Sequence, residues 1–316
     1  MFALTSYIKI TDPSGTKYID FDFINEVEID KSRRNLTNTA SIKIARRLKV
    51  LNGDITEIIQ RGSKVEIQLG YDSNLRTEFT GFVSKVGAKT PVVIECEDDM
   101  WSLKQNSFTK AWKKVKVAEI IKYVYQGQAQ VVDLEIGGLV IKKQSTAQVL
   151  DGLRKFGLQC YFDNGVLIVD FAGVVHTQGK EVIYNFYQNI IDNELEYKRK
   201  EDFRIKVRAI SKLHNGKKIE LVIGDNDGEE HTLHYTNMDK DQLLKIASSE
   251  IDKLKYDGYK GSFKTFGLPY IQPGDIAILL DDDYPEHNGS YLTESVKTNF
   301  STSGFRREPV PERKVA

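Results

Sequence analysis

The chain has 316 residues, 40% of them hydrophobic, and its 45 lysines and arginines balance its 45 aspartates and glutamates. This length favours two or three domains with substantial cores. A formal net charge of zero argues against a dedicated nucleic-acid-binding protein, which would usually be strongly basic, and no apolar run approaches the roughly 20 residues that span a bilayer.

Residues 1–108 are predicted to form a first domain, because apolar and polar residues alternate along most of residues 1–103 as in half-buried strands. Turn signals separate these strands at residues 12–15 (DPSG), at Leu51-Asn52-Gly53-Asp54 and at residues 71–74 (YDSN). Short strands with regular turns predict an antiparallel barrel or sandwich.

Residues 109–175 are predicted to form a small α+β module. Basic residues without clean alternation at 104–116 indicate a connector, and helical apolar spacing follows at 117–126. Ser145 or Thr146 is a candidate cap for a second helix over 146–156, which Gly157 would end. The sequence Asp163-Asn164-Gly165 then predicts a hairpin between strands 158–162 and 166–171.

Residues 176–316 are predicted to form a second β-barrel domain, since alternation resumes over 181–236 and again after residue 258. A helix near 239–256 interrupts the strands, with Asn237 or Asp239 as its cap. The strands of residues 181–222 fit the first barrel as well as the second. The predicted fold class is therefore α+β, mostly β, with two antiparallel β-barrel domains and a small central α+β module.

Two segments of the chain share a pattern that suggests an internal repeat. Residues 62–69 and 81–86 each begin with glycine and continue as an alternating strand, and residues 274–280 and 289–296 do the same. This pattern pairs Gly62 with Gly274 and Gly81 with Gly289. Duplication of one barrel would produce it, although any hairpin whose strands begin with glycine would look similar.

Candidate metal and catalytic residues do not combine into a site. Cys96 and Cys160 lie in apolar runs, as expected for two buried thiols in a reducing compartment. His231 and His234 are three apart on a predicted strand, so they point to opposite faces; the other histidines are isolated (His176, His214 and His287). Residues 225–228 and 281–283 lack the glycine of a calcium loop at its sixth position and fit turns better. We therefore expect no enzyme activity, no metal and no cofactor.

Trp112 stands among lysines at residues 110–116, a pattern that can bind single-stranded nucleic acid. A solvated connector with one anchoring tryptophan explains the same residues, and we favour that interpretation.

The order of several motifs resembles the baseplate hub family of phage tails, which includes late control protein D and the hub domain of type VI secretion spike proteins. In the N-terminal part the motif residues are Gly62 and Gly81, followed by the Cys96 strand. In the C-terminal part they are Pro273, Gly274, Asp275, Asn288, Gly289, Tyr291, Gly304 and Arg306.

The resemblance implies two tail-tube-like barrels and a structural role. Such hubs form homotrimers that join a hexameric tail tube to a trimeric central spike, beside other baseplate proteins, with nucleic acid only as cargo in the lumen. No glycine-rich β-helix follows the hub-like part, so the resemblance implies a separate spike protein. The expected location is the tail baseplate of a virion. The N-terminal residues show no signal peptide, which predicts synthesis in a bacterial host cytoplasm.

A second hypothesis comes from another functional class. A tail-associated protein that degrades cell walls or binds glycans would also be rich in strands, and paired catalytic carboxylates are not visible in one sequence. In that case the central module would hold the glycan.

Overall fold

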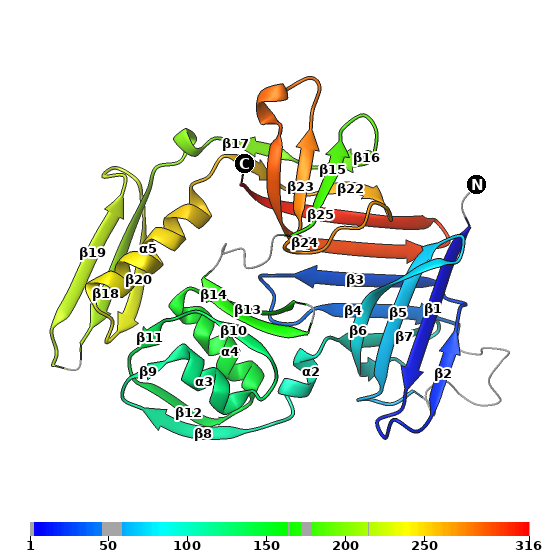
Figure 1. The fold of residues 1–316 in the computed structure, drawn as a ribbon, viewed down its shortest axis with the longest axis horizontal. Helices are drawn as coiled ribbons and strands as arrows, with labels where there is room; N and C mark the ends of the chain where they lie inside the picture. The colour runs from blue at the N-terminus through cyan, green and yellow to red at the C-terminus, as the bar shows by residue number, and fades with distance from the viewer. Residues whose placement is uncertain (1–2, 46–58, 164, 172–178, 214, 316) are drawn as a thin grey trace.

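The structure, a computed structural model, describes residues 3–45, 59–163, 165–171, 179–213 and 215–315 (Figure 1). The predicted turn at residues 51–54, the central Asn164 of the predicted hairpin, His176 and His214 lie outside the described residues.

The N-terminal part consists of strands, as its alternating sequence predicts. Inward-facing Ile8, Ile67 and Ile94 are all 0% exposed and share one core cluster. The pairing is antiparallel throughout, in the order β3-β4-β7-β6-β5-β1-β2. The strands are β1 (Leu4–Thr11), β2 (Tyr18–Phe21), β3 (Glu26–Ser32), β4 (Thr39–Ile44), β5 (Lys64–Tyr71), β6 (Asn74–Val86) and β7 (Val92–Glu97).

The central part is the predicted α+β module. Ser145 caps the second predicted helix in a capping box with Gln148, and Gly157 follows it with a φ of 76°. The predicted connector is partly wrong, because β8 forms within it and pairs with β12. The elements are α2 (Met100–Leu103), β8 (Phe108–Trp112), β9 (Val115–Lys116), α3 (Val117–Val124), β10 (Ala129–Val131), β11 (Glu135–Ile136), β12 (Leu139–Gln144), α4 (Thr146–Leu153), η1 (Arg154–Phe156), β13 (Leu158–Asp163) and β14 (Val166–Phe171).

The C-terminal part returns to strands around one long helix, α5 (Lys240–Leu254). Of the two predicted caps, Asp239 is the one used, and Gln242 completes its capping box. The other elements are β15 (Glu181–Asn185), β16 (Ile190–Asn193), β17 (Glu196–Lys198), η2 (Lys200–Asp202), β18 (Ile205–Lys212), β19 (Lys218–Gly224), β20 (Glu229–Thr236), β21 (Gly258–Lys260), β22 (Phe263–Phe266), β23 (Ile276–Leu280), η3 (Pro285–His287), β24 (Gly289–Ser301) and β25 (Gly304–Lys314).

The two ends of the chain share one sheet. Strand β24 pairs with β3 from Ser295↔Ser32 to Ser301↔Glu26, and this pairing joins the N-terminal and C-terminal strands (Figure 1). The predicted class, α+β and mostly β, is confirmed. The two barrels expected are not closed: the described strands form an open hydrogen-bonded path that ends at β16 and β2.

The strand order contains the internal repeat. The order β3-β4-β7-β6-β5 at one end recurs as β16-β22-β25-β24-β23 at the other, antiparallel in every pair. We call residues 4–97 the first repeat unit, and residues 181–198 with 258–314 the second.

Equivalent hydrogen bonds inside each unit show which residues of the two units correspond. Gly62 N donates to Val83 O and Gly274 N donates to Thr293 O, at 2.8 and 2.9 Å. A bulge follows each acceptor, between Val83 and Lys85 and between Thr293 and Ser295. The predicted match of Gly62 with Gly274 is therefore correct. The match of Gly81 with Gly289 is wrong by two residues: Gly81 pairs with Val65, and its counterpart Tyr291 pairs with Ala277.

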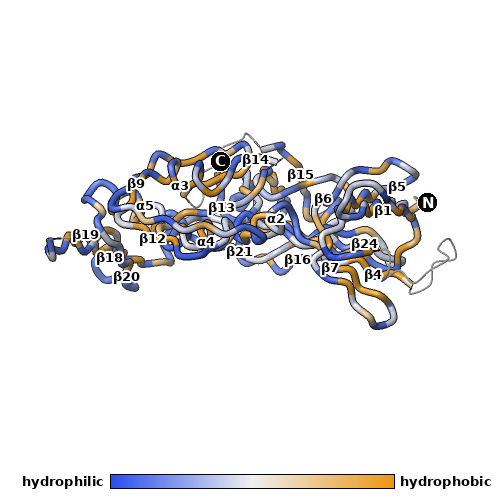
Figure 2. The backbone as a smooth tube through the Cα atoms, turned by 90° about the horizontal axis from the view of Figure 1, so that it is seen from below, coloured by the Kyte–Doolittle hydropathy of each residue, from blue (hydrophilic) through white to orange (hydrophobic). Residues whose placement is uncertain are grey.

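The repeat units differ in one connection. Strands β3 and β4 are joined by residues 33–38, whereas β17 and β21, which extend β16 and β22, are joined by residues 199–257. This insert contains η2, the sheet β19-β18-β20 and helix α5. In Figure 2 its sheet lies at the opposite end of an elongated molecule from β1.

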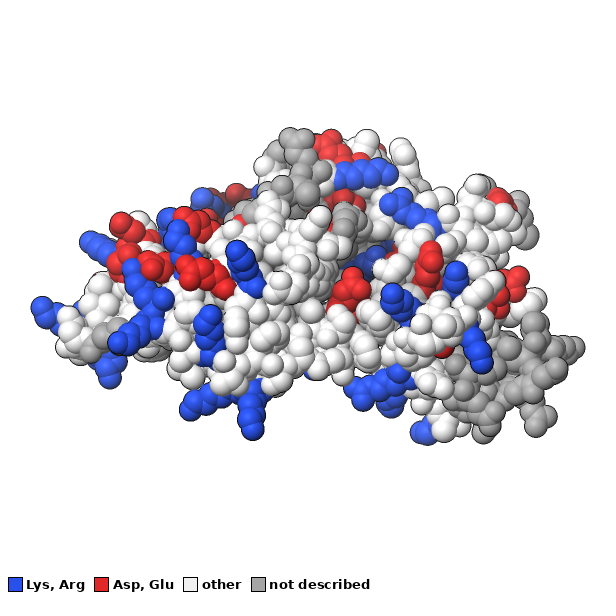
Figure 3. Space-filling model, turned by 60° about the horizontal axis from the view of Figure 1, so that its bottom comes forward, with Lys and Arg blue, Asp and Glu red and all other residues white. Residues whose placement is uncertain are grey.

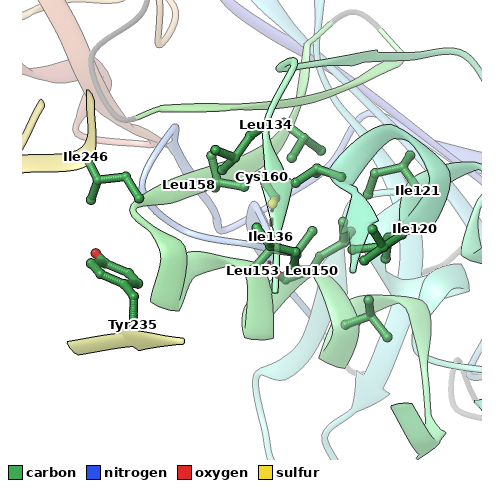
Figure 4. Packing of buried hydrophobic residues seen from close by; sticks show 14 of the residues in the cluster. Ile120, Ile121, Leu134, Ile136, Leu150, Leu153, Leu158, Cys160, Tyr235 and Ile246 are labelled. Atoms are coloured by element: carbon green, nitrogen blue, oxygen red, sulfur yellow. Dashed lines mark hydrogen bonds between the residues drawn. The ribbon is translucent and has the colours of Figure 1, made fainter. Parts of the chain in front are cut away.

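The insert packs on the central module. Val207, Tyr235 and Ile246 of the insert belong to the same buried cluster as Ile121 and Leu150 of the module. Figure 4 shows Tyr235 and Ile246 directed toward the module's apolar residues. The predicted domain boundaries, at residues 108/109 and 175/176, remain a prediction.

The units also differ at the sheet edge. In the first unit β5 pairs with β1, which pairs with β2; in the second unit β23 pairs with β15, in parallel, and the described sheet ends there. On the outer side of β15, Asn189 Nδ2 donates to Ile183 O (3.1 Å) and Asn189 Oδ1 accepts from Asn185 N (2.8 Å). One side-chain amide thus bonds two of the outward backbone groups that a further strand would use.

Candidate interaction surfaces

The motif glycines mark backbone positions that other residues would strain. Gly62 and Gly274 have φ of 90° and 96°, in the left-handed region that favours glycine. A Cβ on Gly81 would lie 2.1 Å from Glu97 O, so the approach of β6 to β7 excludes a side chain there. Gly304, with φ 136°, turns the chain between β24 and β25. Gly62, Gly81 and Gly274 thus shape the sheet, and Gly304 shapes the end of the β24–β25 hairpin.

Asp275 ties two segments together. Its carboxylate accepts hydrogen bonds from Lys180 N (3.0 Å) and Gln272 N (2.9 Å), so it joins the start of β15 to the turn before β23. Asp275 is 5% exposed, and this burial raises the pKa of its carboxyl. Pro273 and Gly274 form the same turn.

Residues 281–288, which we call the acidic loop, join β23 to β24. Asn288 Oδ1 accepts from Asp281 N (2.6 Å), and Tyr291 donates from its hydroxyl to His287 O (2.6 Å). The His287 ring stacks on Tyr197 with a centroid distance of 3.9 Å and on Tyr284 at 5.5 Å. The motif residues Asn288 and Tyr291 therefore hold the loop in shape, and Gly289 begins the strand that leaves it.

The acidic loop presents charge and one large ring to solvent. Asp282, Asp283 and Glu286 are exposed, and 56% of Tyr284 is exposed. Asp283 accepts a hydrogen bond from the hydroxyl of Tyr187. The loop is thus an ordered, acidic protrusion next to β15.

A buried ion pair joins the two repeat units. Arg307 Nη2 lies 2.5 Å from Glu78 Oε1, and Arg307 Nη1 lies 3.0 Å from Glu78 Oε2. The same guanidinium donates to Gly267 O (2.8 Å) and to the Thr298 hydroxyl (3.1 Å). Arg307 and Glu78 are 2% and 3% exposed, so both charged groups are shielded from bulk water.

A groove of about 840 Å³ lies over this ion pair, between the β5–β6 turn and the end of the β24–β25 hairpin. Tyr71 spans it, because its hydroxyl lies 3.3 Å from Phe305 O and the two rings are 5.5 Å apart. Large apolar side chains line it, with Arg76 and Arg306 beside them. The lining includes Leu4, Leu69, Tyr71, Phe266, Leu268 and Phe305.

The two arginines of the groove stack on aromatic rings. Arg76 lies 3.4 Å from the centroid of Tyr270, and Arg306 lies 4.9 Å from that of Phe266. Within the described part of the chain neither has a carboxylate within ion-pair distance. Of the motif residues, the groove brings together Gly304 and Arg306; the other motif residues do not reach it.

Sequence reasoning missed Glu78 and Arg307. No strand is predicted from the sequence over residues 304–314, where the structure has β25. Arg306 and Arg307 are adjacent in β25, and adjacent strand residues point to opposite faces. One of the two must therefore point inward and needs a buried acid.

Two kinds of catalytic group, metal ligands and reactive thiols, can be assessed among the described residues. No group of three or more metal-ligating side chains gathers among them. Cys96 and Cys160 are buried, as predicted, and burial raises the pKa of both thiols, that of Cys160 to about 12. A thiol with a raised pKa is a poor nucleophile. The described helices include none that is both long and apolar enough to cross a membrane.

Trp112 belongs to a packed aromatic group rather than to a solvated connector. Its ring meets that of Tyr123 edge-on at 5.6 Å, and Lys110 lies over both rings at 4.9 and 4.4 Å. The face in Figure 3 carries charges of both signs, with no continuous basic surface on its described part. The packing of Trp112 on Tyr123 favours the structural interpretation of these residues over the nucleic-acid one.

Solved structures with the same fold cover nearly the whole chain. A tail protein from Neisseria meningitidis MC58 matches with a TM-score of 0.68 and 14% identity, over 98% of this chain and 97% of that one. The 43 kDa tail protein of prophage MuSo2 from Shewanella oneidensis matches with a TM-score of 0.67 and 13% identity, over 98% of both chains.

A component of the type VI secretion system of E. coli matches with a TM-score of 0.60 and 9% identity, over 93% of this chain and 74% of that one. By sequence, no family model and no curated protein matches. The predicted resemblance to tail hub and secretion spike proteins is thus confirmed at the level of the fold.

Proposed function

We propose that this chain is a structural, non-enzymatic subunit of the baseplate hub of a phage tail or a related contractile injection machine. The observation that carries the proposal is the internal repeat: one chain holds two units with the same strand order, hydrogen-bond register and bulge. The shared fold with two tail proteins, one of them from a prophage, over 98% of the chain supports it.

The repeat suits an adapter between two symmetries. A homotrimer of such chains offers six similar units, which match a hexameric tail tube. The module and the insert occur once per chain, so the same trimer offers three copies of them to a trimeric spike. Nucleic acid is then cargo in the lumen. This assignment places the chain in the virion tail baseplate.

The apolar groove and the acidic loop fit a role in assembly. An exposed groove of this size with apolar lining marks an interaction surface in most proteins. Three aromatic residues of the described part of the central module, Phe108, Trp112 and Tyr123, pack on one another, which favours a structural role for them over glycan binding.

Light scattering of the purified chain across a concentration series tests the proposal. We expect three times the chain mass, or a shift toward it as concentration rises, and ring-shaped particles in electron micrographs. Co-sedimentation with the tube protein and the spike protein of the same gene cluster should follow. A strict monomer or dimer that binds neither protein contradicts the proposal. Reproducible clearing of purified cell walls supports the enzyme instead.

A further inference from the structure

The two repeat units differ in the length of two of their hairpin connections. In the first unit only Asp72 and Ser73 separate β5 from β6; in the second unit the acidic loop, residues 281–288, separates β23 from β24. The next hairpin differs in the same direction. From the matched residues Val83 and Thr293, β6 ends at Val86 whereas β24 continues to Ser301. The first unit thus has a short turn and a short hairpin, and the second has a long loop and a long hairpin.

Inside the chain, a short turn meets a long hairpin. The end of the β24–β25 hairpin reaches the β5–β6 turn, where Tyr71 contacts both Phe305 and Gly267. If like units follow one another around a ring, the next junction joins the second unit of one chain to the first unit of the next. There the acidic loop would face the short β6–β7 hairpin.

The charges of these two surfaces are opposite. Residues 87–91, which join β6 to β7, carry Lys89 and no acid, and Lys85 lies just before them. Lys89 is exposed and has no described carboxylate within ion-pair distance; Lys85 is paired with Glu95 at 3.0 Å on the surface. The acidic loop offers the exposed carboxylates of Asp282 and Glu286. Opposite charges at an interface rim favour encounter and fix its orientation.

We propose that the acidic loop docks on the Lys85–Lys89 segment of a second copy of this chain, where its length compensates for the short β6–β7 hairpin. This inference rests on the proposed function, because it assumes that like units follow one another in a ring. It adds the location of the contact between chains and the residues that form it.

A charge-swap experiment tests the contact. Three proteins are compared with the unchanged chain by sedimentation velocity: Asp282→Lys, Lys89→Glu, and the double variant with both changes. We expect each single variant to raise the concentration for half-assembly about tenfold or more, since a like-charge contact replaces an opposite one. The double variant should recover most of the loss. Asp252→Lys, on the exposed face of α5, is the control with the same charge change and should assemble normally.

Chemical cross-linking gives a second, independent measurement. A zero-length carbodiimide reagent applied to a mixture of isotopically heavy and light chains should join the Lys89 amine to an acidic-loop carboxylate between a heavy and a light chain. The inference is overturned if the chain never self-associates, or if it assembles while both single variants behave like the control. Assembly unaffected by the single variants would leave the proposed function standing, because the trimer would then form through another surface.

Discussion

Glu78 of the first repeat unit and Arg307 of the second are bound through two hydrogen bonds at the base of the groove, with almost no access to water. They come from strands β6 and β25, so the pair ties together parts of the chain that are far apart in sequence. Each oxygen of Glu78 has its own nitrogen of Arg307, and the remaining donors of Arg307 reach Gly267 and Thr298.

Loss of one partner of this pair should be more harmful than loss of both. Arg307→Met leaves the Glu78 carboxylate buried without its cation, which should lower the free energy of unfolding by about 3–5 kcal/mol. Combining it with Glu78→Leu removes that isolated charge, so the double variant should be more stable than Arg307→Met. Urea unfolding measures both. Lys85→Met, at an exposed ion pair, should change stability by less than about 1 kcal/mol. Equal losses in the single and double variants would contradict the expectation.

Asp98 should make stability depend on pH. It is 8% exposed, and burial raises the pKa of its carboxyl to about 6, from 3.8 in an unfolded chain. Burial disfavours the charged form, so the contribution of Asp98 is fully present below pH 3.8 and is lost as pH rises through about 6. The corresponding change is about 3 kcal/mol at most.

Urea unfolding between pH 4 and pH 7 measures this effect. Asp98→Asn should flatten the decline in stability over that range, whereas Asp99→Asn, which removes only a minor cause of the raised Asp98 pKa, should change it far less. An identical pH profile for Asp98→Asn and the unchanged chain would disprove the assignment.

The matched glycines of the two units should respond unequally to alanine. Gly62→Ala and Gly274→Ala both force a side chain into the left-handed region, at about 1–2 kcal/mol each. A Cβ on Gly62 would also lie 3.1 Å from the Trp101 ring, whereas one on Gly274 has no neighbour closer than 3.9 Å. Thermal unfolding should therefore rank Gly62→Ala as the less stable. Gly152→Ala, inside α4 with open space around it, should stabilise the chain by up to about 1 kcal/mol.

The Tyr291 hydroxyl should matter for the acidic loop. Tyr291 is fully buried and its hydroxyl holds His287 O, so Tyr291→Phe should cost about 1 kcal/mol and speed amide exchange in residues 281–288. Tyr284→Phe changes an exposed ring and serves as the control. Unchanged exchange in Tyr291→Phe would show that the ring stack alone orders the loop.

Local signals in the sequence predicted the elements that depend on local chemistry. Alternation predicted β5 and β7, and the caps Ser145 and Asp239 lie where helices begin. The order of the strands is not local. Nothing near Glu26 or Ser301 indicates that these residues pair, because the partner of an edge strand depends on the whole fold.

The candidate surfaces were only partly predictable. The motif Asn288-Gly289-x-Tyr291 indicated the place of the acidic loop, but its register against the first unit was wrong by two residues because the turns differ in length. The groove forms only when β5 and β25 meet, so no segment of the sequence indicates it.

The side-chain amide of Asn189 affects how the unassembled chain can associate with other copies. A sheet with a bare outer strand is a template on which further chains add without limit, and such growth yields fibres. Asn189 covers part of the edge of β15. Its side-chain amide donates to Ile183 O and accepts from Asn185 N within the same chain. Strand addition is thereby hindered at this stretch of β15, so the edge contributes less to uncontrolled growth.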